Sequence, residues 1–242
     1  MTERFDLYPV GDRNILIEFG DTIDEQTNKR VTQFTDQIQN QNNPAILDMI
    51  PTYTSLLINY DPLSMSYQDM VLYLQRNREF SGENKESVTR IFQIPVCYEP
   101  DFGPDLEQVA SLTGLSTEEV ITRHSSRDYR IYMIGFMPGF AYLGGMDQSI
   151  AVPRLDKPRI EIPGGSVGIG GQSTGIYPLP SPGGWQLLGQ TPLKPYDPNR
   201  DPAILYRAGD KIRFVPISST KFTEIKQQVE AGTYQVIVKE EI

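Results

Sequence analysis

Three segments decide the fold expected of this chain: GFMPGFAYL at residues 135–143, PGGSVGIGGQSTGIYP at 163–178 and SPGGW at 181–185. The region from residue 129 to 192, which contains them, holds 13 of the 20 glycines and the only tryptophan, Trp185. Glycine permits positive φ and close backbone approach, whereas proline fixes φ, so interleaving the two predicts rigid, shaped loops. Such loops are suited to positioning a small molecule.

The strands between these turns predict a β-barrel or sandwich. Short, turn-bounded apolar runs occur at residues 129–134, 166–169, 185–188 and 211–215. We expect the same domain to contain, in addition, a strand at 89–98, helices at 105–113, from Ser116 to His124 and at 221–231, and a strand at 233–238.

The first part of the chain predicts a small α/β sandwich in the order ββαββα. The helix after Asp24 repeats apolar residues at helical spacing, and a second helix starts at Ser66. The polar segment 81–86 has the composition of a linker, which divides the chain into a two-layer α/β domain at 1–84 and a β-rich domain at 85–242. The strands expected in the first domain are 5–10, 14–19, 45–49 and 55–60.

Composition excludes several classes of protein. The chain has 242 residues, a net charge of −9 and a pI near 4.7, so a nucleic-acid partner is not expected. No apolar run is long enough to span a membrane and no signal peptide opens the sequence, so we expect a cytoplasmic protein. Cys97 is the only cysteine, and its apolar surroundings favour a buried thiol over a nucleophile.

His124 is the only histidine and therefore the only side chain whose unperturbed pKa lies near neutrality. It is a candidate general base, to be weighed against a surface histidine at the C-terminal end of a helix. No second histidine is present to form a His-x-x-x-His pair with it, so we predict no metal site.

Arg154 and Arg159 each follow a proline and could together clamp a carboxylate or phosphate. The alternative is a salt bridge to Asp156 or Glu161. The glycine run at 164–171 lacks the features of a phosphate-binding loop or a dinucleotide fingerprint, but its amides could form a nest for an anion. The aromatic residues of the region could line a pocket or serve as core or interface packing: they are Phe136, Phe140, Tyr142, Tyr177 and Trp185.

These motifs resemble the family of bacterial 5-oxoprolinase B subunits, also called KipI-like or allophanate hydrolase subunit 1, with the carboxyltransferase subdomain C/D. The most specific segments are 135–140, the Pro-Arg pairs at 153–154 and 158–159, 174–178 and 181–185, and the similarity covers both expected domains. The resemblance implies an α+β fold in which a small N-terminal α/β sandwich precedes a cyclophilin-like β-barrel.

The resemblance also implies an activity with partners. Family members work with a larger cyclophilin-like subunit, of the PxpC or KipA type, and a PxpA-like third subunit, and open 5-oxoproline to glutamate with ATP and Mg²⁺ bound in the assembled complex. This chain carries no biotin-attachment sequence. The alternatives are a KipI-type inhibitor of a sporulation histidine kinase and a subunit of a urea or allophanate carboxyltransferase-like enzyme.

Together these considerations give a set of candidate residues. His124 is the catalytic candidate. The candidates for binding substrate or phosphate are Arg154, Arg159, Gly164, Gly165, Ser166, Gln172 and Thr174. The candidates for the pocket or subunit interface are Phe136, Pro138, Gly139, Phe140, Tyr142, Tyr177, Pro182, Gly183, Gly184 and Trp185.

Overall fold

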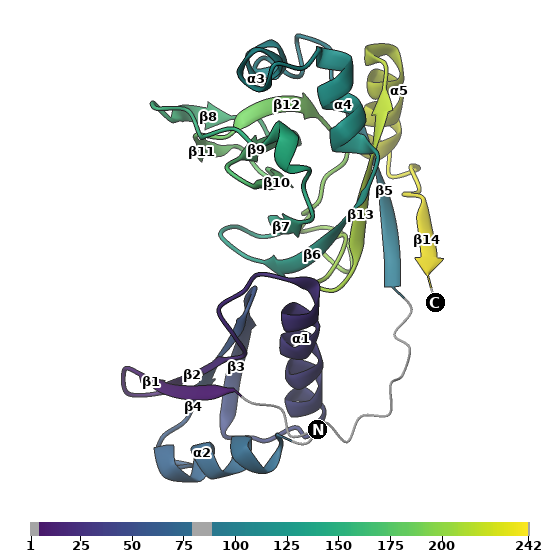
Figure 1. Cartoon of the computed structure of the whole chain (residues 1–242). Helices are drawn as coiled ribbons and strands as arrows, with labels where there is room; N and C mark the ends of the chain where they lie inside the picture. Colours follow the sequence, from purple (N-terminus) through teal and green to yellow (C-terminus); the bar gives the residue numbers. More distant parts are fainter. Residues whose placement is uncertain (1–4, 79–88, 242) are drawn as a thin grey trace. The chain divides into compact units, whose positions relative to one another are not determined.

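The computed structural model describes residues 5–78 and 89–241, and the chain divides into two compact units, Met1–Ser87 and Val88–Ile242 (Figure 1). The predicted linker at 81–86 and the domain boundary at 84/85 lie outside the described residues. The location of that boundary therefore stays a prediction.

The first unit is the two-layer α/β sandwich that the sequence predicts. Its antiparallel sheet has the order β1-β2-β4-β3, and both helices pack against it in one buried cluster, which includes Phe34 and Met70 of the helices and Ile17 and Leu56 of the central strands. The elements are β1 (Asp6–Val10), β2 (Asn14–Glu18), α1 (Glu25–Asn40), β3 (Ile46–Pro51), β4 (Ser55–Tyr60) and α2 (Tyr67–Arg76). Asp24 and Ser66 cap the two helices, as expected.

The second unit contains a closed β-barrel. Its described strands follow the order β12-β9-β10-β7-β6-β13-β5, and a pairing of Gln190 in β12 with Cys97 in β5 closes the ring. The barrel elements are β5 (Thr89–Cys97), β6 (Asp128–Ile134), β7 (Ala141–Gly144), β9 (Ser166–Gly170), β10 (Ser173–Ile176), β12 (Gln186–Gln190) and β13 (Lys211–Ile217). This closed barrel confirms the predicted fold class.

Other elements cover or extend the barrel. They are α3 (Leu106–Thr113), α4 (Thr117–Ser125), α5 (Ser219–Glu230), the edge strand β14 (Val238–Glu241) and the two-stranded ribbon of β8 (Arg159–Ile162) and β11 (Ser181–Gly183). Ser116 forms the predicted capping box with Glu119 at the start of α4. The strand predicted at 233–238 is wrong, because the pairing with β5 begins only at Val238. The short strands β7, β8, β10 and β11 were not expected from the sequence.

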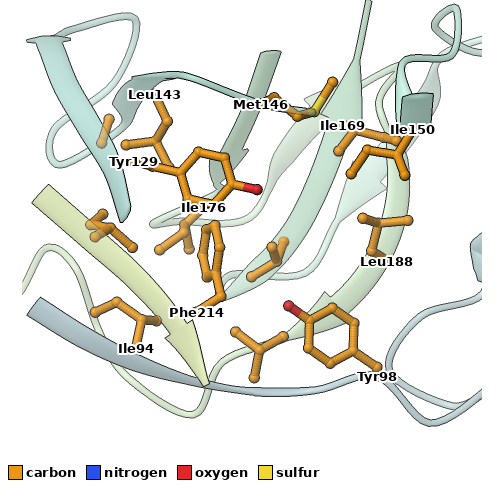
Figure 2. Packing of buried hydrophobic residues seen from close by; sticks show 14 of the residues in the cluster. Ile94, Tyr98, Tyr129, Leu143, Met146, Ile150, Ile169, Ile176, Leu188 and Phe214 are labelled. Carbon is orange, nitrogen blue, oxygen red and sulfur yellow. The ribbon is translucent and has the colours of Figure 1, made fainter. Parts of the chain in front are cut away.

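Side chains fill the barrel interior, so it is a packed core and not a channel. Figure 2 shows Tyr129, Ile176 and Phe214, from three different strands, packed together in it. The hydroxyl groups of Tyr98 and Tyr129 lie within this apolar cluster, where each requires a hydrogen-bond partner. That partner is His124 for both.

Candidate functional site

The GFMPGF segment connects β6 to β7 by two successive tight turns. The amide of Met137 donates to the carbonyl two residues earlier (2.8 Å) across Phe136, whose φ is +67°, which is a γ-turn of the rare, strained hand. The amide of Phe140 then donates to the carbonyl of Met137 (3.1 Å), with Pro138 and Gly139 (φ +79°) between them, as in a type II turn. The first turn leaves the Phe136 side chain 70% exposed.

Pro138 and Gly139 do not line the pocket but build the turn, so of their two expected roles only the one at a subunit interface stays a prediction. A Cβ on Gly139 would lie 2.9 Å from the Cβ of Tyr196, so the backbone here packs closely on a neighbouring segment. The carbonyl of Gly139 also accepts a hydrogen bond from the hydroxyl of Tyr206 (2.9 Å). The second turn is therefore held in place at Gly139, while the side chain of Phe136 projects from the first turn.

The glycines of β9 and β10 make room for the single tryptophan. A Cβ on Gly170 would lie 2.6 Å from the Trp185 ring, and one on Gly175 would lie 3.2 Å from it. The indole is consequently 6% exposed, although its neighbours Gly183 and Gly184 stand at the surface of the pocket. These glycines are explained by side-chain packing, not by the close approach of a ligand to the backbone.

A pocket of about 160 Å³ opens beside this tryptophan. Phe140 is its central ring: the centroids of Tyr142, Tyr177 and Trp185 lie 5.0, 5.6 and 5.7 Å from that of Phe140, all with steeply inclined planes. Phe136 lies edge-on to it at 5.6 Å. The complete lining is Phe136, Phe140, Tyr142, Arg154, Tyr177, Pro182, Gly183, Gly184 and Trp185. The expected aromatic pocket is therefore present.

The two arginines of the Pro-Arg pairs have different environments. Arg159 donates to the carboxylate of Asp105 (Nη2 to Oδ1, 2.6 Å), and Asp105 also accepts from the amide of Leu187 (2.6 Å). Arg154 is exposed, has no ion pair within the described residues, and places its guanidinium carbon 5.9 Å from the Trp185 ring centroid. The expected two-arginine clamp is therefore wrong as a pair, because Asp105 engages Arg159.

Asp105 is a residue that the sequence analysis did not single out. It was only the first residue of the helix predicted at 105–113, yet it precedes α3, its side chain makes no capping bond and it is almost fully buried. Together with Arg159, which also reaches the carbonyl of Trp185 (3.4 Å), it ties α3 to the start of β12. This ion pair therefore helps to position the backbone at residues 185–187, which carries the tryptophan of the pocket.

The expected anion nest at 164–171 is not formed. The amide of Gly165 donates to the carbonyl of Tyr177 (2.6 Å) and that of Ser166 to the carbonyl of Pro163 (3.2 Å). The following amides belong to β9, which has strands on both sides. Gly164 accepts a bond from the side chain of Gln190 at its carbonyl (2.9 Å).

Gln172 and Thr174 do not line the pocket either. Gln172 is exposed in the two-residue turn between β9 and β10. Thr174 is fully buried and donates from its hydroxyl to the carbonyl of Gly168 (3.1 Å). Neither side chain is therefore placed to bind a ligand in this pocket.

His124, the catalytic candidate, lies inside the barrel core and does not line the pocket. Its ring is fully buried, stacks on Phe214 at 4.5 Å, and is hydrogen-bonded through Nδ1 to the hydroxyl of Tyr98 and through Nε2 to that of Thr174, both at 2.8 Å. Since Thr174 donates onward to Gly168, the network assigns the proton to Nε2 and makes Nδ1 the acceptor.

Burial lowers the pKa of His124 from 6.5 to about 3, so the imidazole is neutral at physiological pH. Both of its nitrogens already have partners, and no surface remains through which it could reach a substrate. We therefore assign it a structural role in the barrel instead of the expected role of general base. The alternative of a surface histidine at a helix end is also wrong, although His124 does lie in the last turn of α4.

Other expectations concern Cys97, metals and membranes. The thiol of Cys97 is buried, and burial raises its pKa, as expected for a structural cysteine. Within residues 5–78 and 89–241, no three acidic, histidine or cysteine side chains gather in a way that could hold a metal ion. Over the same residues, no helix has the length and apolar character needed to cross a membrane.

The family described as carboxyltransferase domain, subdomain C and D, matches residues 5–206. The chain belongs to this family. It is 42% identical to the 5-oxoprolinase B subunit of Bacillus subtilis (strain 168) over 238 residues, which cover 94% of this chain and 99% of that relative. The residues of the aromatic pocket all fall within the matched range.

Two solved structures are similar to this chain in fold. The crystal structure of TTHA0988 is 36% identical, with a TM-score of 0.76, and the match covers 86% of this chain and 40% of that one. The urea carboxylase of Kluyveromyces lactis has a TM-score of 0.79 at 20% identity over 98% of this chain and 24% of its own. The second likeness concerns the fold alone.

Proposed function

We propose that this chain is the B subunit of a 5-oxoprolinase, an enzyme that opens the lactam of 5-oxoproline to glutamate. The observation that carries the proposal is the match to the Bacillus subtilis 5-oxoprolinase B subunit, which extends over nearly the whole length of both chains at 42% identity. Its geometric support is a small, open pocket, six of whose nine lining residues come from the GFMPGF and SPGGW motifs.

The chain provides only part of the active site under this proposal. His124 is buried in the core, Arg159 is engaged by Asp105, and the amides of Gly165, Ser166 and Gly171 are bonded to backbone carbonyls. The groups that this chain offers to a substrate are therefore aromatic walls and the guanidinium of Arg154. We propose that the larger cyclophilin-like subunit and the third subunit supply the remaining groups.

ATP with Mg²⁺ belongs to this proposal because an unactivated lactam is a poor electrophile, and phosphorylation of its oxygen creates a leaving group. The residues present here do not fit a nucleotide. A pocket of about 160 Å³ lies below the range typical of drug-sized ligands, and the nest amides that could cradle phosphates are already paired. We therefore assign nucleotide binding to residues outside this pocket, in the assembled complex.

The rim of the pocket offers a surface to a partner subunit. Phe136 is 70% exposed on one side, and Ile160, on the β8 strand that pairs with β11, is 93% exposed. The β8–β11 ribbon is labelled in Figure 1, and its strand β11 contains Ser181, Pro182 and Gly183 of the SPGGW motif. An exposed phenylalanine at a small pocket, together with an exposed isoleucine on the ribbon that supplies part of the pocket lining, fits a site that is closed by another chain.

The experiment is reconstitution. The three subunits are expressed separately and together, and glutamate release from 5-oxoproline is followed with and without ATP. We expect ATP-dependent release only when this chain is present with its partners. An Ile160→Asp variant should reduce release by weakening assembly, whereas Leu112→Asp, an exposed leucine on α3, is the matched control.

Activity of the two partner subunits that is unchanged by omission of this chain would contradict the proposal. A stable, stoichiometric complex of the three subunits that releases no glutamate from 5-oxoproline would also contradict it. The kinase-inhibitor alternative predicts binding to the dimerisation helices of a histidine kinase, and the same purified chain can be tested for it.

A further inference from the structure

The pocket combines a set of apolar walls with a single cation among its described lining residues. Phe140, Tyr177 and Trp185 are nearly buried and belong to one packed cluster, so three of the walls are rigid. Arg154 lies at the edge of the same cavity, over the indole. A ligand that fits this arrangement has a small apolar body and one negative charge.

The anion that Arg154 can take is better a carboxylate than a phosphate. A phosphate group carries nearly two charges and several acceptor oxygens, and protein sites meet it with multiple donors. Here the second arginine is engaged by Asp105, and the amides of Gly165 and Ser166, the expected anion donors, are bonded to carbonyls. One guanidinium matches one carboxylate through two parallel N–H···O bonds.

We propose that this pocket binds the lactam substrate itself, with the methylene edge of its five-membered ring against Trp185 and Phe140 and its carboxylate on Arg154. The inference rests on the proposed function for the identity of the substrate. It adds that this chain, and not a partner subunit, binds the substrate, which the proposed function alone does not specify. This chain would then recognise the substrate. The amide group of the lactam would face the open mouth of the pocket, where a partner subunit can act on it.

Trp185 is the only tryptophan, so its fluorescence reports on this pocket without interference. The full chain is titrated with 5-oxoproline, with 2-pyrrolidinone, which has the ring but not the carboxylate, and with inorganic phosphate. We expect a saturable change in emission for 5-oxoproline, binding of 2-pyrrolidinone that is weaker by about 10- to 100-fold, and no response to phosphate.

Arg154→Gln should weaken 5-oxoproline binding by the same factor, and thermal unfolding followed by circular dichroism should be unchanged because the side chain is exposed. Arg207→Gln removes a guanidinium whose side chain is 73% exposed elsewhere on the barrel and is the matched control. In the reconstituted complex, Arg154→Gln should raise KM for 5-oxoproline by about 10- to 100-fold and leave KM for ATP unchanged.

An active complex in which Arg154→Gln leaves KM for 5-oxoproline unchanged would overturn the pocket assignment while the proposed function stands. A change confined to KM for ATP, or competition by phosphate for the fluorescence signal, would overturn it in favour of a phosphate site. A reconstituted complex that contains this chain and has no 5-oxoprolinase activity would instead remove the proposed function. Saturable binding of 5-oxoproline by the chain would still support the pocket in that case.

Discussion

Protonation of His124 should destabilise the barrel, because the imidazolium cannot be accommodated where the neutral ring now sits. Its ring is fully buried, and burial lowers its pKa from 6.5 to about 3. The network also requires Nδ1 to accept from the Tyr98 hydroxyl, which is impossible once that nitrogen carries a proton. The unfolded chain, in contrast, protonates at the ordinary pKa.

The sign and size of the effect follow from that difference. Above pH 6.5 both states hold a neutral ring, and the full stability is present. As the pH falls from 6.5 toward 3, only the unfolded state takes up the proton, so the free energy of unfolding falls by about 1.4 kcal/mol per pH unit. Between pH 7 and pH 5 the loss is about 2 kcal/mol, a large part of the stability of an ordinary domain.

Two measurements test this prediction. Urea unfolding is followed from pH 5 to 8 for the wild type and for His124→Gln, whose amide can both donate and accept but does not titrate. The variant should be less stable at pH 8 because the network is disturbed, and its stability should fall less steeply below pH 6.5. The single histidine also gives one imidazole resonance, which should not shift between pH 8 and pH 5 in the folded chain.

Parallel pH profiles for the two proteins, or an imidazole resonance that titrates near pH 6.5 in the folded state, would refute the buried placement. The same variant tests the assignment of role. When it is assembled at a temperature where it is folded, turnover per complex should be retained, because the ring does not reach the pocket.

Three further predictions concern the pocket. Phe136→Gly should be more stable than Phe136→Ala by about 1 kcal/mol in chemical unfolding, since only glycine is unstrained at φ +67°, and the ordinary order with alanine ahead would contradict the γ-turn. Gly170→Ala should cost about 1–3 kcal/mol of unfolding free energy and shift Trp185 emission, because the added methyl meets the indole; an unchanged spectrum would argue against this packing. Asp105→Asn should cost about 1.5–3 kcal/mol by weakening its bonds to Arg159 and Leu187, and thermal and chemical denaturation identical to wild type would show the ion pair to be dispensable.

The sequence predicted the pocket but misplaced the histidine, and both outcomes have a physical reason. Aromatic residues next to glycine and proline turns are local features, so Phe136 and Trp185 could be identified by inspection. The burial of His124 also had a local signal: it stands four residues after Val120, on the buried face of α4. A histidine on an apolar helical face fits a hydrogen-bonded core position as well as it fits a catalytic one.

The role of Arg159 could not be predicted, because its partner is distant in the chain. The sequence offered Asp156 and Glu161 as neighbouring carboxylates, whereas the ion pair is made with Asp105, 54 residues away. Only the barrel topology, which brings the start of α3 against β12, decides between them. The same topology leaves Arg154 as the exposed member of two otherwise similar Pro-Arg pairs.

The glycine-rich segments have a consequence for interpreting variants of this chain. Gly170 and Gly175 make room for the bulk of Trp185, since a Cβ would lie 2.6 Å from its ring at Gly170 and 3.2 Å from it at Gly175. Losing one of them would therefore impair the site by displacing the indole and not by removing a ligand contact. A tryptophan held by surrounding backbone loses little freedom when a ligand packs against it, so this packing pre-organises the pocket. The motif that resembles a phosphate-binding loop thus contributes to the pocket by fixing the position of one aromatic wall.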